Sequence, residues 1–140
     1  MNSIFIKDIN NGKDLKTKNL HLLISVCIIV PIAIVYGLMP NGILREIFTM
    51  QSWTPDLANI FRAIMGLYVA MSIFWIIGIT RSKFWVAATL SNVLFMTGLA
   101  FGRIISIILD ETPSCIFLIG FIIEVILAAW GIINLKKYKI

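Results

Sequence analysis

The sequence has few charged residues and few cysteines, and both shortages restrict what the protein can be. Only 14% of its 140 residues are charged, whereas 59% are hydrophobic. A typical soluble domain is about a quarter charged and about half apolar. Cys27 and Cys115 fall in different hydrophobic segments and at different predicted depths, so we expect free thiols that fill the core. This composition does not fit an ordinary soluble domain.

Catalytic and metal-binding motifs are also missing. The sequence contains no Ser/His/Asp set, no Gly-rich phosphate loop and no nucleotide-binding motif. No cluster of His, Cys, Asp or Glu has the spacing of a metal site. We therefore expect no metal and no cofactor, and we do not favour an enzyme.

The hydrophobic residues gather in four long blocks, each near the roughly 20 residues that a helix needs to cross a bilayer. They predict an all-α fold, a four-helix transmembrane bundle that runs up-down-up-down. We expect a loosely ordered cytoplasmic tail at 1–19, a transmembrane domain at 20–136, and an outer loop at 40–56 with a short interfacial helix. The predicted helices are, in order, 21–38, 57–79, 83–109 and 113–135.

The net charge of +5 comes from basic residues on one side of this predicted bundle. Nine of the twelve lysines and arginines are Lys7, Lys13, Lys16, Lys18, Arg81, Lys83, Lys136, Lys137 and Lys139. Outside the spans, Arg45 is the only basic residue on the opposite side. This positive-inside pattern predicts that both termini are cytoplasmic in a bacterial inner (plasma) membrane. It also argues against nucleic acid as a partner.

Three ionisable residues, Arg62, Arg103 and Glu124, fall inside the predicted spans. Each costs roughly 2.5–3.5 kcal/mol at the centre of a bilayer, so each should face the bundle and find a partner. At about 1.5 Å per residue, they lie roughly 8, 9 and 15 Å from the outer ends of their helices. Each sits on a stripe of small residues, such as Gly98 and Gly102 beside Arg103, which we expect to contact another helix. We expect Arg103 and Glu124 to contact each other or to share a partner.

Two guanidiniums and one carboxylate leave a surplus positive charge in this region. Because the planar guanidinium binds carboxylate and phosphate with two parallel hydrogen bonds, we expect an outward-facing polar pocket that binds an anionic amphiphile or small acid. Its ligand would be a membrane lipid or an anionic small molecule, and its role binding or sensing. The residues expected to line it are Arg62, Arg103, Glu124, Ser106, Asn59 and Tyr36.

Other functions remain open on the same residues. Glu124 would be the general acid or base of a membrane-embedded enzyme that acts on a lipid-like substrate. It would instead be the proton-coupling carboxylate of a small transporter, working as a homodimer. In an accessory subunit, the ion pair would only fix the helix register. We expect His21, at the cytoplasmic start of the first span, to be an interface residue, like Trp75, Trp85 and Trp130.

Several short motifs resemble those of one family. They are Tyr36-Gly37-Leu38-x-Pro40, Arg62-Ala63-x-Met65-Gly66-Leu67-Tyr68, Gly102-Arg103-x-x-Ser106, Pro113-Ser114 and Glu124. In this order they resemble Domain of Unknown Function 4345, a family of small bacterial membrane proteins, over about residues 22–135. The resemblance implies a four-helix membrane bundle and no defined activity.

Overall fold

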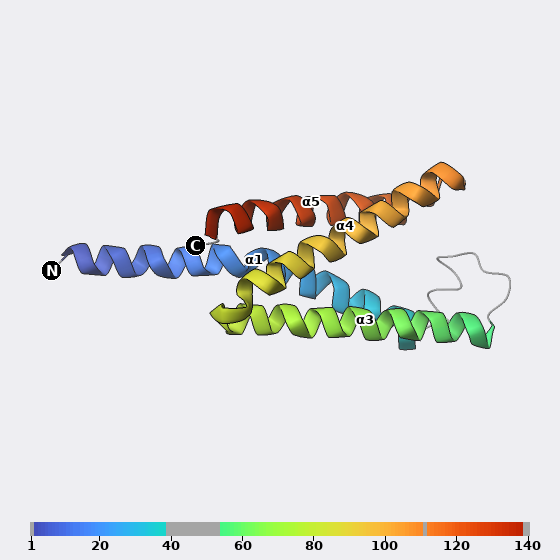
Figure 1. The fold of residues 1–140 in the computed structure, drawn as a ribbon, viewed down its shortest axis with the longest axis horizontal. Coiled ribbons are helices and arrows are strands. Elements are labelled where there is room, and N and C mark those ends of the chain that lie inside the picture. Colours follow the sequence, from blue (N-terminus) through green and yellow to red (C-terminus); the bar gives the residue numbers. More distant parts are fainter. Residues whose placement is uncertain (1, 39–53, 111, 139–140) are drawn as a thin grey trace.

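The computed structural model describes residues 2–38, 54–110 and 112–138. This part of the chain contains four α-helices and one short 3-10 helix, and no strand (Figure 1). The elements are α1 (Asn2–Leu38), α3 (Pro55–Thr80), η1 (Ser82–Phe84), α4 (Trp85–Leu109) and α5 (Cys115–Tyr138). The predicted all-α fold with four helices is confirmed.

All four helices are long and apolar enough to cross a membrane. The apolar segments are Thr17–Leu38, Pro55–Thr80, Ser82–Leu109 and Cys115–Tyr138. Their outer faces carry many exposed aliphatic side chains, such as Leu94, Ile108 and Ile133, which are 60–74% exposed. Because water disfavours such surfaces and hydrocarbon accepts them, these helices indicate a multi-pass membrane protein.

The helix boundaries follow the local chemistry closely at α3 and less closely elsewhere. The Thr54 hydroxyl accepts a hydrogen bond from the Leu57 amide at 3.2 Å, Pro55 is the first helical residue, and Asp56 lies in the first turn. The predicted start of the third helix at 83 is a 3-10 turn, and α4 begins at Trp85 without a side-chain cap.

The predicted loose tail is wrong as a description of residues 2–19. The structure continues α1 without a break from Asn2 through the first span, since no proline precedes Pro31 and a helix extends easily once it is nucleated. The predicted interfacial helix falls mostly in 39–53, outside the described residues.

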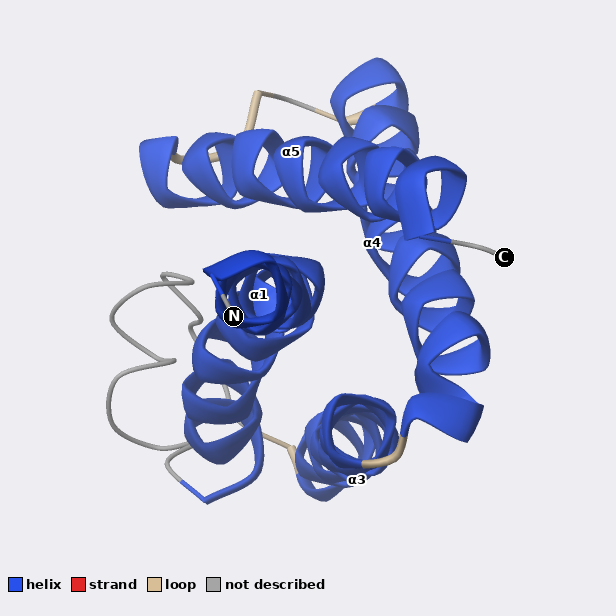
Figure 2. Cartoon of the chain, turned by 90° about the vertical axis from the view of Figure 1, so that its left-hand side faces the viewer, coloured by secondary structure: helices blue, strands red, loops and turns tan. Residues whose placement is uncertain are grey.

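The helices pack as two close pairs, α1 with α3 and α4 with α5. Viewed end-on, α3, α4 and α5 form an arc with α1 on its inner side (Figure 2). The η1 turn joins α3 to α4, and α4 then diverges from α3 along its length (Figure 1). We call the end near this turn the His21 end, and the opposite end, where α3 begins and α4 stops, the Arg103 end.

The buried core lies toward the His21 end. On α4, every residue classed as buried lies between Trp85 and Ala100. Three glycines outside the pocket region allow close helix approach: Gly37 faces Met65, Gly78 faces Ala88, and Gly131 faces Val93. The core residues are Leu22, Ile29, Ala33, Tyr68, Trp75, Trp85, Ala88, Met96, Leu127 and Ala128.

Several side chains do not lie where the sequence predicted. Trp75 and Trp85 are 0% and 1% exposed, so they are core residues and not membrane-interface anchors. His21 is also 0% exposed. Cys27 and Cys115 are free thiols but exposed, so the prediction that they fill the core was wrong.

Candidate binding site around Arg103

An ion pair between α4 and α5 forms the centre of the site. Arg103 Nε donates to both carboxylate oxygens of Glu124, at 3.0 and 2.8 Å, and Nη2 donates to Oε1 at 2.8 Å. The Glu124 side chain is 8% exposed and that of Arg103 is 26% exposed. The predicted contact between these two residues is therefore confirmed. Such a two-pronged contact fixes both side chains in one geometry.

The helix faces explain how this pair forms. On α4, Asn92, Met96 and Arg103 recur at helical spacing along the face that points into the bundle. On α5, Gly120 lies one turn before Glu124, and a Cβ atom at Gly120 would stand 3.4 Å from Arg103 Nη2. The missing side chain at Gly120 therefore leaves room for the guanidinium to lie against α5.

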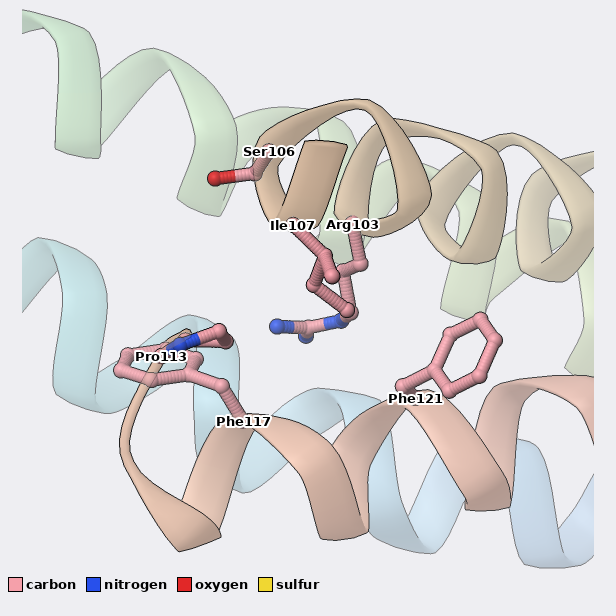
Figure 3. A pocket seen from close by; sticks show the side chains of 6 residues that line it. All are labelled: Arg103, Ser106, Ile107, Pro113, Phe117 and Phe121. Atoms are coloured by element: carbon pink, nitrogen blue, oxygen red, sulfur yellow. The ribbon is translucent and has the colours of Figure 1, made fainter. Parts of the chain in front are cut away.

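A pocket of about 250 Å³ opens beside the ion pair, between the ends of α4 and α5. Figure 3 shows Arg103 reaching from α4 toward α5 into the space bordered by Phe117 and Phe121. The guanidinium carbon lies 5.6 Å from the centre of the Phe117 ring. The lining residues are Arg103, Ser106, Ile107, Pro113, Phe117 and Phe121. One cationic group, one hydroxyl and four apolar walls can bind a molecule with a small polar head and an apolar body.

Two tyrosines approach the ion pair from the other pair of helices. Tyr36 on α1 and Tyr68 on α3 lie 6.0 Å apart between ring centres, and both interact electrostatically with Arg103 and Glu124. Phe61 packs edge-on against Tyr36 at 5.3 Å. Tyr36 therefore lies near the ion pair, but it is not among the residues that line the pocket, where the sequence had placed it.

Arg62 and Asn59 do not face the bundle, which corrects the prediction from the small-residue stripes. Both side chains are exposed on α3. The face of α3 that meets the bundle carries its buried residues Ala58, Phe61 and Tyr68. The rings of Phe61 and Tyr68 both pack near that of Tyr36 on α1, which holds this face inward. Because Arg62 is the next residue after Phe61, it points about 100° away from that face.

Ser106 lines this pocket, and its hydroxyl also donates to Asp110 Oδ2 at 3.1 Å. Gly98 and Gly102 were expected to contact another helix, yet a Cβ atom at either position would meet no atom within 4 Å. The apolar walls were missed altogether, because phenylalanine and isoleucine occur all along the spans and carry no signal of their own. Both glycines are exposed, so they lie on an outer face of α4 and do not form a helix contact within the described residues.

Within the described ranges, no three His, Cys, Asp or Glu side chains lie close enough to hold a metal ion. A family model matches residues 17–135, a range that includes Arg103, Ser106 and Glu124. The chain belongs to the family described as Domain of unknown function (DUF4345).

The DUF4345 match spans all four apolar helices and includes the whole Arg103 pocket. A comparison with curated proteins found no match, and neither did a comparison with solved structures. The family description names no activity, so the argument for function rests on the pocket itself.

Proposed function

We propose that this DUF4345 protein binds an anionic amphiphile or small acid in the pocket between α4 and α5. The observation that carries the proposal is that Arg103 is the only charged residue among the described residues that line the pocket. A carboxylate or phosphate head would accept hydrogen bonds from the guanidinium edge that faces the pocket, and an acyl chain would lie against Ile107, Phe117 and Phe121.

The ion pair gives this arginine a fixed position before any ligand arrives. Nε and Nη2 are held by Glu124, so little side-chain entropy is lost when the remaining edge of the guanidinium binds. Gly120 and Phe117 complete this support from α5. Such preorganisation suits a binding or sensing role.

The geometry gives less support to roles that depend on Glu124. Both of its oxygens accept hydrogen bonds from Arg103, and Glu124 is not among the residues that line the pocket. A general acid or base must reach the substrate directly or through one water molecule. We therefore prefer binding over the enzyme and the proton-coupled transporter.

The test compares anionic and neutral amphiphiles of equal chain length in lipid nanodiscs. A long-chain fatty acid should raise the thermal unfolding temperature, and the matching fatty alcohol should not, because only the acid pairs with the guanidinium. In the double variant Arg103→Gln/Glu124→Gln, which leaves no unpaired buried charge, the difference between the two amphiphiles should disappear. Arg62→Gln is the matched control, since Arg62 is exposed and outside the pocket.

Equal stabilisation by the acid and the alcohol would contradict the proposal and leave a purely structural role for the ion pair. Loss of the difference in the Arg62→Gln control would move the anion site to α3.

We also propose a plasma-membrane location of bacterial type, with both termini cytoplasmic. The support is the charge distribution: Lys18, Arg81, Lys83, Lys136 and Lys137 all belong to the His21 end. A cytoplasm-specific reporter fused after residue 140 should be active. Activity of a periplasm-specific reporter at the same position would overturn this orientation.

A further inference from the structure

A second polar region lies inside the His21 half of the bundle, away from the Arg103 pocket. On α4, Trp85, Thr89 and Asn92 follow one another at helical spacing along the buried face, and each is at most 1% exposed. Ser72 on α3 is 1% exposed. The hydrogen bond from Trp75 Nε1 to Ser91 Oγ, at 3.1 Å, aligns α3 with α4 and places Ser72 near the level of Asn92.

The polar atoms of these residues have no hydrogen-bond partner among the described residues. They are Trp85 Nε1, Thr89 Oγ1, Ser72 Oγ and both amide atoms of Asn92, together with His21 Nε2 nearby. The His21 ring lies 6.4 Å from that of Trp85, in an edge-to-face arrangement. These donors and acceptors therefore gather in one region of the interior.

Other interior hydroxyl groups nearby do have hydrogen-bond partners, so the lack of partners is confined to this group of residues. Ser25 and Ser91 are also interior hydroxyls, and each donates to a backbone carbonyl one turn back, at 2.9 and 2.8 Å. Thr89 and Ser72 have no such bond. Leaving a buried donor or acceptor unpaired in a membrane interior is unfavourable, so this group requires polar molecules as partners.

A second cavity lies at one end of this region. A pocket of about 170 Å³ opens at the His21 end, and its polar lining is Lys18, Asn19, Thr80, Ser82 and Trp85. Trp85 thus belongs both to this mouth and to the buried stripe. At the other end of the stripe, Met96 follows Asn92 on the same face and is 1% exposed, so an apolar layer separates the stripe from Arg103.

We propose that the pocket at Lys18 and Ser82 is the mouth of a hydrated path along α4, and that water bound inside pairs with Thr89, Asn92 and Ser72. Buried water of this kind typically makes about three hydrogen bonds to groups that would otherwise be unpaired. The path ends at the apolar layer around Met96, which makes it accessible from one side of the membrane only. It supplies water to the middle of the bundle independently of the Arg103 pocket.

The test measures hydrogen–deuterium exchange of single thiols in proteoliposomes by infrared spectroscopy of the S–H stretch. Cys27 and Cys115 are first replaced by serine, which both positions tolerate because they are exposed. Thr89→Cys and the nearly isosteric Ser72→Cys then report on the path. Ala33→Cys is the matched control, since Ala33 is 0% exposed and belongs to the apolar core.

We expect exchange at Thr89→Cys and Ser72→Cys to be at least about tenfold faster than at Ala33→Cys, since only local opening exposes a dry core position. Circular dichroism melts identify variants that fail to fold, and two reporters keep the test decisive if one fails. Exchange as slow as that of Ala33→Cys at both positions would overturn the hydrated path.

The mouth is tested separately. Ser82→Trp fills the pocket and should slow exchange at Thr89→Cys by a factor of about ten, because opening fluctuations would then limit access. Arg81→Trp adds the same bulk at the neighbouring exposed residue, outside the pocket lining, and should not slow it. Equal rates in the two tryptophan variants would overturn the assignment of the mouth.

Discussion

The two ends of the bundle accommodate polar groups in opposite ways. At the Arg103 end the polar groups are charged, paired with each other, and placed beside a pocket between separating helices. At the His21 end the interior polar groups are neutral, largely unpaired with one another, and enclosed by closely packed helices. The comparison teaches that this bundle pairs its buried charges within the protein, whereas its buried neutral groups depend on the water that we propose there.

The glycines show the same contrast. At the His21 end, Gly78 and Gly131 lie against Ala88 and Val93, so these glycines bring helices together. Near the Arg103 end, a Cβ atom placed at Gly102 would meet no other part of the described chain within 4 Å. A small residue in a transmembrane helix therefore does not by itself identify a helix contact, even where its spacing fits one.

The largest expected effect breaks the charged pair. Glu124→Gln leaves Arg103 without its partner in a site where Glu124 is 6% exposed. We expect the free energy of unfolding to fall by about 3–5 kcal/mol, as for other buried pairs that lose one member. Reversible denaturation in nanodiscs or detergent measures the loss.

The double variant Arg103→Gln/Glu124→Gln serves as the control for this change. It removes both charges and should recover part of the stability, because no unpaired charge remains. Losses that simply add would show that the two side chains are not energetically coupled.

The next effect contrasts the glycines of the two ends. At Gly131, a Cβ atom would come within 2.5 Å of Val93 Cγ2. Gly131→Ala should therefore destabilise the protein by about 1–3 kcal/mol through overpacking. Gly102→Ala should be neutral or stabilising by up to about 1 kcal/mol, since alanine favours a helix more than glycine does. Thermal unfolding of the two single variants side by side checks the comparison, which fails if Gly102→Ala is the more harmful change.

A smaller effect concerns the hydrogen-bonded group around His21. The Asn134 amide nitrogen lies 2.8 Å from His21 Nδ1 and donates to the Lys18 carbonyl oxygen at 3.4 Å, tying α5 to α1. Asn134→Leu removes these contacts from a position that is 3% exposed. We expect a loss of about 1 kcal/mol, the net value of an ordinary buried hydrogen bond. No loss would indicate that α1 and α5 are joined by apolar packing alone.

The smallest effect is expected at Arg62, which the sequence analysis placed in the pocket and the structure places on the exposed side of α3. Arg62→Gln should change the free energy of unfolding by less than about 0.5 kcal/mol, because the side chain is exposed. Arg103→Gln, measured alongside it, should be far more harmful because it leaves the Glu124 carboxylate buried without a partner. Comparable losses for the two variants would show that Arg62 has a partner inside the bundle.

The ion pair of the Arg103 site was predictable because charges inside membrane helices are rare and costly. That rarity singled out Arg103 and Glu124, whose opposite charges suggested their contact. It also singled out Arg62, which lies outside the site, and it gave no sign of the apolar walls of the pocket. The buried polar residues of the His21 end, such as Thr89 and Asn92, gave no such signal. Histidine, asparagine and threonine inside spans are common enough that neither their burial nor their lack of partners followed from the sequence.

By itself, the sequence determined the four apolar helices and the family, because these depend on hydrophobic length and residue order. Only the tertiary structure decided which way each helix is rotated about its axis. That rotation turned Arg62 outward and brought Arg103 over Gly120. When all sides of a helix are apolar, as on α5, hydrophobicity does not distinguish the face that meets protein from the face that meets lipid. The choice then depends on packing of particular side chains, such as Phe61 against Tyr36, which the sequence does not specify locally.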